Sequence, residues 1–428
     1  MIKISTLSTI IFFSLLFPGF FLSPFSAHAQ EPNNPDEAKK LTVTGYVQGQ
    51  FDIGQEFATS KLSNSPSYNN ERDGTSDHFF RFGVRRGRII LKSEESFGTV
   101  VLQTDFTEKG INLKDFYYKV SEPWLKLASL SVGIFDLPFG FDISHSTFRR
   151  ENAELPVIYQ ELFPDDKDVG TMLTISVPKE SKWYGLQLNA GFFCGNAVAT
   201  PDNGDMDFCG RIKYNKKWSN VSFGIGSSFY FGTVRNTDVS LFQVKDGKWE
   251  QTTVEKNLKN ARQYVGFDTQ LSVQTSWGIT TLRGEILSGS QPSTAGKLRS
   301  PNKDLMPYGA TPFNHIRRFS SWYFYCIQDV GQTPLSVVLR YVYLDPNTKI
   351  KSEEITQKTD LSYRYLGAGF MVRCNAAMRL MCYYDLPFNS TDNRIPVSEA
   401  PATGKNHVAN YQKHMKEGLF TCRLQYRF

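Results

Sequence analysis

An arginine-dense stretch is the part of the sequence best suited to binding chemistry. Residues 80–88 hold four arginines, Arg81, Arg85, Arg86 and Arg88. A guanidinium group presents several N–H donors in a planar fork, which suits the oxygens of phosphate and other anions. A group of them on one wall would concentrate anions, whereas arginines paired with nearby carboxylates would only neutralise charge. The sequence leaves both interpretations open.

A second set of basic residues lies in segment 137–167, which holds Arg149, Arg150 and Lys167. Long segments without regular structure tend to be functional, and this one is long enough to fold inward and supply the positive side of a constriction. It also holds six acidic residues, so its formal balance is three basic against six acidic and its net charge is −3. The excess puts phosphate selectivity in doubt. The acidic residues are Asp142, Glu151, Glu154, Glu161, Asp165 and Asp166.

The secondary-structure elements that position these residues can be predicted from a period-two alternation of apolar and polar residues. The final segment shows it clearly, because Phe420, Cys422 and Leu424 alternate with Thr421 and Arg423. Such alternation predicts strands with one face in an apolar medium and the other in water. We expect sixteen strands, at 41–53, 79–95, 97–107, 111–121, 126–136, 168–178, 182–195, 207–217, 219–232, 260–276, 278–289, 317–330, 334–345, 361–374, 376–386 and 417–428.

The connections between these strands alternate between short and long. Short turns fall near positions 96, 122, 180, 219, 277, 331 and 375, and all but one of the other connections are longer. This is the loop pattern of a transmembrane β-barrel with short periplasmic turns and long external loops. In such a barrel, arginine on the lipid face at the midplane costs ~2–4 kcal/mol, so at least one parity of the arginines in 80–88 must face the lumen. A β-bulge would turn both parities inward.

Tryptophan placement and the two chain ends support export to an outer membrane. Trp124, Trp183, Trp218 and Trp277 each lie beside a short turn, as expected of an interfacial aromatic girdle. Residues 1–29 read as a cleavable signal peptide, 30–40 as a short N-terminal periplasmic segment and 41–428 as the barrel. Phe428 ends the last amphipathic strand, and we interpret it as the assembly signal for the outer-membrane insertion machinery.

The sequence around the long third external connection resembles a known family. The run Gly133-Ile-Phe135-Asp-Leu-Pro138-Phe139-Gly140 and the later Lys167-Asp-Val-Gly170, with the signal peptide and the aromatic terminus, look like the phosphate-selective porin O and P family. The resemblance covers about 41–428. It implies a sixteen-stranded, trimeric channel with an inward-folded third loop, in which Arg149 and Arg150 line the constriction and Lys167 takes the basic place before Gly170.

Cysteine and histidine positions favour no catalytic, metal or redox site. The six cysteines lack CxxC spacing, and Cys194 and Cys209 lie on opposite faces of their strands, so we expect free, buried thiols. His145 between two serines does not by itself assemble a nucleophile and base, which argues against a barrel hydrolase. Asp165 and Asp166, with Asp168, lack the ordered ligand spacing of a calcium site and read as a solvated turn.

The sequence therefore predicts a transmembrane antiparallel β-barrel that acts as a passive channel for small anions, with phosphate as the candidate solute. We expect no cofactor, no metal ion and no nucleic-acid partner, since the net charge is only +6 and no Lys/Arg tract is present. A porin for neutral or mixed solutes, with Tyr117, Tyr341 and Tyr343 as sliding contacts, is the alternative. Arg211, Lys213 and Arg283 are weaker lumen candidates, and an adhesin acting through its loops is a further possibility.

Overall fold

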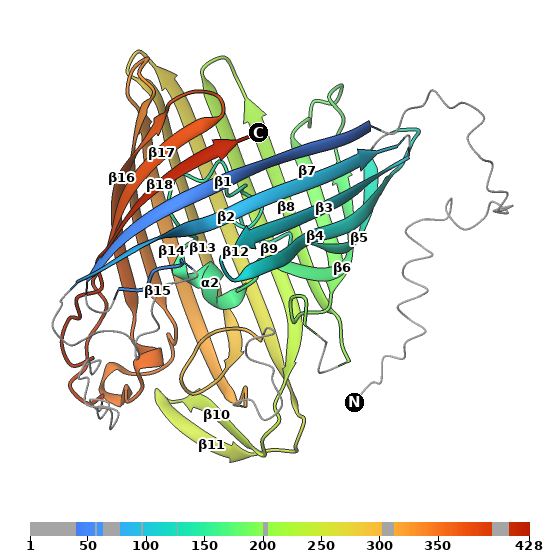
Figure 1. Cartoon of the computed structure of the whole chain (residues 1–428). Helices are drawn as coiled ribbons and strands as arrows, with labels where there is room; N and C mark the ends of the chain where they lie inside the picture. Colours follow the sequence, from blue (N-terminus) through green and yellow to red (C-terminus); the bar gives the residue numbers. More distant parts are fainter. Residues whose placement is uncertain are drawn as a thin grey trace, which may run out of the picture. The chain divides into compact units, whose positions relative to one another are not determined.

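The computed structural model describes residues 40–55, 58–62, 78–95, 97–125, 127–199, 204–301, 312–395 and 411–428. The predicted signal peptide at 1–29 lies outside these residues, as does 30–39 of the predicted N-terminal segment. Eighteen strands of the described chain form one sheet, and sixteen of them close into an antiparallel barrel because β1 pairs with both β2 and β18 (Figure 1).

The sixteen barrel strands match the predicted segments to within a few residues. They are β1 Lys40–Gln55, β2 His78–Glu94, β3 Gly98–Thr107, β4 Gly110–Ser121, β5 Ala128–Asp136, β6 Lys167–Ser176, β7 Leu186–Phe193, β8 Asp207–Lys217, β9 Val221–Arg235, β12 Lys259–Thr275, β13 Gly278–Ser293, β14 His315–Asp329, β15 Leu335–Asp345, β16 Tyr363–Arg373, β17 Met378–Pro387 and β18 Leu419–Arg427.

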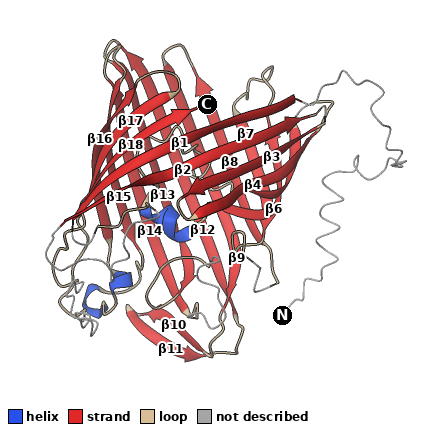
Figure 2. Cartoon of the chain, viewed as in Figure 1, coloured by secondary structure: helices blue, strands red, loops and turns tan. Residues whose placement is uncertain are grey.

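The remaining elements lie in the long connections. A hairpin of β10 (Ser240–Lys245) and β11 (Lys248–Thr253) interrupts the connection from β9 to β12, which pair directly with each other. Figure 2 shows how little of the described part of the chain is helical: α2 (Val157–Leu162) and two 3₁₀ turns, η1 (Ser352–Glu354) and η2 (Lys358–Asp360). No helix in the described part of the chain has the length and apolar character needed to cross a membrane.

The alternation that predicted the strands separates two chemically different faces. On β18, Arg423 and Gln425 are almost fully buried toward the lumen, whereas Leu424 and Tyr426 are about half exposed on the outer face. Alternate residues along a strand therefore point to opposite faces, so that polar side chains face the lumen and apolar side chains face outward. The four tryptophans beside short turns are all exposed, consistent with a girdle at one end of the barrel.

The last residue helps to close the ring. Phe428 exchanges backbone hydrogen bonds of 3.0 and 3.1 Å with Gly45 on β1. A Cβ at Gly45 would overlap the Phe428 ring, so glycine at this position lets the terminal aromatic ring lie against β1.

Candidate functional site

A β-bulge in the arginine-dense strand determines which way its side chains face. The pairing of β1 with β2 shifts register at this point, so Gln48 lies opposite Arg86 while Gly49 lies opposite Val84. Arg85 is the extra residue between them. Adjacent side chains of a regular strand point to opposite faces, and a bulge breaks this rule locally. Arg85 and Arg86 consequently both contact groups inside the barrel, and the bulge expected from the arginine spacing is present.

Arg81 and Arg88 lie on the two sides of this bulge. The Arg88 guanidinium donates two hydrogen bonds to the Asp105 carboxylate on β3, with N···O distances of 2.5 and 2.7 Å. Arg81 lies opposite Asp52 of β1 and donates to the backbone oxygen of Phe80 at 2.7 Å. A bidentate pair of this kind neutralises the charge of Arg88 locally.

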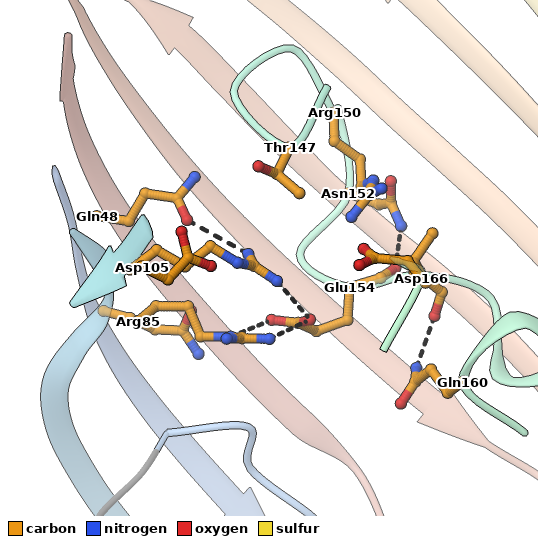
Figure 3. A network of polar contacts seen from close by, with 12 residues as sticks. Gln48, Arg85, Asp105, Thr147, Arg150, Asn152, Glu154, Gln160 and Asp166 are labelled. Carbon is orange, nitrogen blue, oxygen red and sulfur yellow. Dashed lines mark hydrogen bonds and ion pairs between the residues drawn. The ribbon is translucent and has the colours of Figure 1, made fainter. Parts of the chain in front are cut away.

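Glu154 is the point at which segment 137–167 meets the arginines of the wall. Arg85 holds its carboxylate through two hydrogen bonds of 2.7 and 2.8 Å, and Arg423 of β18 donates to it at 2.8 Å. Arg86 lies 3.8 Å from the same carboxylate. Figure 3 shows Glu154 reaching from the loop toward Arg85. Arg340 of β15 donates to the backbone oxygen of Glu154 at 2.9 Å, which ties the loop to a third part of the wall.

The single carboxylate of Glu154 therefore forms ion pairs with three guanidinium groups. Burial alone would raise the pKa of Glu154, but the positive charges of Arg85, Arg86 and Arg423 bring it well below its ordinary value of 4.5. Glu154 is thus ionised at neutral pH, and its single negative charge leaves the cluster with a formal excess of positive charge. We call Arg85, Arg86, Arg423 and Glu154 the arginine cluster.

Aromatic packing fixes the two ends of the loop against another part of the wall. The hydroxyl of Tyr159 on α2 donates to Glu285 on β13 at 2.5 Å, and Tyr323 on β14 donates to the same carboxylate. Phe139 is fully buried, and the backbone N–H of Gly140 donates to Ser228 on β9 at 2.9 Å. The loop is therefore held to β9, β13 and β14 on one side, and through Glu154 to β2 and β18 on the other.

The residues of the loop-entry motif serve this packing. Gly140 has a φ of +65°, and a Cβ there would overlap the Tyr159 hydroxyl. Gly133 lies opposite Gly170 in the β5–β6 ladder, and Phe135 packs edge-on against Phe193. The carbonyl of Pro138 accepts a hydrogen bond from the thiol of Cys209. The motif therefore fixes where the loop leaves the wall and enters the aromatic cluster.

The three basic residues predicted in the loop lie in different environments. Arg149 is exposed. Arg150 is buried and donates to the backbone oxygens of Asp142 and His145 at 3.0 and 3.2 Å, so it holds the loop's own conformation. Lys167 is buried between Asp115 and Asp136, 2.6 Å from an oxygen of each.

Wall arginines also engage the loop's acidic excess. Arg283 of β13 lies 3.1 Å from Glu151 and stacks on Phe141, with the guanidinium carbon 4.3 Å from the ring centre. On the wall itself, Arg211 pairs with Asp268 at 2.7 Å. The negative balance of segment 137–167 is therefore offset by residues that lie far away in the sequence.

A large cavity adjoins the arginine cluster through Glu154, the one residue of the cluster that lines it. Its volume is about 970 Å³, and residues of the loop, of β15–β18 and of the external connections line it. Basic side chains outnumber acidic ones on its wall, by six to four. The basic residues are Lys61, Lys297, Arg299, Arg340, Lys358 and Lys413, and the acidic ones are Glu154, Glu161, Asp385 and Glu417.

Sequence reasoning missed Glu154 and Arg423 as partners of the β2 arginines. The alternation placed Arg423 on the polar face of the last strand, and barrel closure placed that strand beside the first, but no local pattern brought Glu154 of the loop to these arginines. The expectation that Tyr341 and Tyr343 line the channel is wrong. Arg340 faces the lumen, so Tyr341 points outward, where it and Tyr343 pack against Trp322.

The predictions for the cysteine, histidine and acidic side chains agree only in part with the structure. All six cysteines are free, as predicted, but only Cys209 is fully buried and Cys374 is exposed. The imidazole of His145 lies 3.4 Å from Glu151. Within the residues that the structure describes, no cluster of three His, Cys, Asp or Glu side chains could hold a metal ion.

Comparisons with family models and with curated proteins found no match. Solved structures do match over almost the whole chain. An anion-selective porin from Comamonas acidovorans superposes with a TM-score of 0.56 at 11% identity, covering 91% of this chain and 100% of that one. OmpF of Salmonella typhi gives 0.55 at 10% identity, covering 92% and 99%. OmpT of Vibrio cholerae, described as a trimer form, gives 0.51 at 9% identity, covering 91% and 100%.

Proposed function

We propose that this protein is an outer-membrane porin that lets small anions, phosphate among them, diffuse passively down their gradients. The closed sixteen-stranded barrel is the fold of the outer-membrane porins. The fold by itself does not select a solute, because similar barrels serve different solutes. The choice of anions rests on the residues inside.

The arginine cluster is the observation that carries the proposal. Three guanidinium groups converge on the single carboxylate of Glu154, so the cluster keeps a formal excess of positive charge, and Glu154 itself lines a large cavity. Rings or clusters of arginine concentrate anions and repel cations at a constriction. Phosphate oxygens match the planar donor fork of arginine particularly well.

Segment 137–167 narrows the pore in this proposal. Its contacts with Arg85 and Arg423 on one part of the wall, and with Glu285 on another, support a loop that folds into the lumen. Arg149 is the loop's exposed cation and adds to the anion path. Arg81 continues that path along β2. Arg88 is paired with Asp105 and stabilises the wall, while Arg150 and Lys167 support the loop and its entry through internal contacts.

The proposal includes the location and partners of the chain. The signal peptide at 1–29 directs export, the outer-membrane assembly machinery engages the strand ending in Phe428, and lipid covers the apolar outer face. A homotrimer is supported by the similarity to OmpT of Vibrio cholerae in its trimer form.

Phosphate competition tests the proposed solute. The purified protein is inserted into a planar lipid bilayer, and chloride current is recorded while phosphate is added at constant ionic strength. We expect phosphate to reduce chloride current, because both anions share the arginine cluster. A weakly selective current that ignores phosphate would instead identify a porin for neutral or mixed solutes.

A further inference from the structure

Two cysteines lie directly opposite each other on the last two strands of the barrel. Cys382 on β17 pairs in register with Cys422 on β18, and their sulfur atoms are 2.8 Å apart. Both are free thiols in this structure. The proposed function gives neither residue a role, and both side chains lie on the outer face, away from the arginine cluster.

The hydrogen-bond pattern of this ladder allows the two sulfurs to be joined. The backbone N–H of Arg427 donates to the carbonyl of Ala377 at 2.8 Å, and these two residues are directly opposite. Hydrogen-bonded and non-hydrogen-bonded pairs alternate along an antiparallel ladder, and Cys422 is an odd number of residues from Arg427. The cysteines therefore form a non-hydrogen-bonded pair, in which Cα atoms are ~4.5 Å apart, within the range that a disulfide spans.

The other cysteines have no comparable partner. Cys326, for example, also lies on the outer face but has Leu282 and Leu339 opposite it on its two neighbouring strands. The paired cysteines are flanked along the same row by Phe370 on β16 and Phe51 on β1. Because the neighbours on the two outer sides are aromatic, each thiol has the other thiol as its polar contact across the ladder.

We propose that Cys382 and Cys422 are a modification site, at which a cross-strand disulfide joins the final strand to its neighbour. The oxidant is a disulfide-bearing oxidase of the compartment that the chain crosses during export, so the step rests on the exported location in the proposed function. One cysteine thiolate attacks the oxidant's disulfide, which forms a mixed disulfide and releases one oxidant thiol. The second cysteine thiolate then displaces the other oxidant sulfur.

Across both exchanges, the two cysteine thiols and the disulfide of the oxidant are converted into the Cys382–Cys422 disulfide and two thiols of the oxidant. The two electrons lost by Cys382 and Cys422 reduce the oxidant to its dithiol form. Oxidation takes place once β17 and β18 have paired and before lipid covers their outer face. The bond then closes a covalent loop around residues 383–421 and restricts the unfolded chain at the end that completes the barrel.

A thiol count tests this directly. The protein is extracted from the outer-membrane fraction of a Gram-negative host and denatured with N-ethylmaleimide in the absence of reductant, and adducts are counted by intact mass. With six cysteines in the chain, we expect four adducts, rising to six after reduction. Peptide mapping of the unreduced protein should recover one linked pair, containing Cys382 and Cys422.

Two variants serve as matched controls. Cys382→Ser should give five adducts with or without reductant, because its partner thiol is freed. Cys326→Ser removes a cysteine from the same outer face and should give three adducts, rising to five on reduction. Six adducts in the unreduced native chain, or a linked pair of other cysteines, would overturn the disulfide.

Membrane fractionation separates this result from a failure of the proposed function. Recovery of the chain outside the outer membrane would contradict the porin proposal. The adduct count decides the disulfide in either case, because it is made on the denatured chain.

Discussion

Replacing Glu154 by glutamine perturbs the proposed selectivity most informatively. The substitution keeps the size of the side chain and an oxygen that can accept a hydrogen bond from Arg85 or Arg423. It removes the only carboxylate that the arginine cluster contains. The cluster then carries the charge of all three guanidinium groups, and the preference for anions should increase.

The expected size follows from the geometry. Glu154 lies 2.7–2.8 Å from two of the guanidinium groups, so an anion drawn to the cluster passes at roughly 5 Å from the removed charge. At this distance in water the interaction energy between the permeating ion and one unit charge is ~0.8 kcal/mol, and screening by salt reduces it to ~0.5 kcal/mol. Anions gain and cations lose this amount, so the anion-to-cation permeability ratio should rise roughly fivefold.

The assay is the reversal potential of single channels in a planar bilayer under a KCl gradient. Glu250→Gln is the matched control, because it makes the same charge change on β11, in an exposed pair with Lys245 in an external hairpin. Folding of both variants is checked by their heat-dependent migration on gels. An unchanged reversal potential in Glu154→Gln, or equal shifts in both variants, would refute the role of the cluster.

Three further changes test other parts of the account. Arg423→Gln should lower the anion preference roughly fivefold and weaken inhibition by phosphate in the same bilayer assay, because the cluster loses one of its cations. Lys167→Met should destabilise the barrel by about 3–5 kcal/mol, because Asp115 and Asp136 lose their common buried partner; the temperature of the heat-dependent gel shift should fall while selectivity is kept. Burial raises the pKa of Glu417, in the last external connection, from 4.5 to about 7. Its folded state therefore favours the protonated form, so the free energy of unfolding should fall as pH rises between these values, and anion preference should fall as Glu417 ionises on the cavity wall. Glu417→Gln should remove both effects in pH-dependent unfolding and reversal-potential measurements.

The strands could be predicted because each one lies between two different media. Alternation is a local property, so the residues of β1 or β18 record it without reference to their neighbours. The hairpin β10–β11 and the helix α2 were not predicted, because they lie in connections that no membrane constrains. Loop length showed where such segments could occur but not what they form.

The candidate site could be predicted only in part, since its energetics come from pairs of residues far apart in the sequence. The arginines of β2 and the bulge that turns Arg85 inward were indicated by the cost of placing arginine in lipid. Their convergence on Glu154 depends on how a long loop packs, which no local pattern encodes. For the same reason the sequence predicted Lys167 to be a pore residue, although in the structure it lies between two carboxylates.

The central claim is that the arginine cluster makes the channel prefer anions. The reversal potential of the unmodified protein under a KCl gradient measures this preference directly, since its sign reports which ion crosses more readily. We predict the sign of an anion-selective channel, produced by three guanidinium groups that share one carboxylate. A reversal potential of the cation-selective sign would contradict the account.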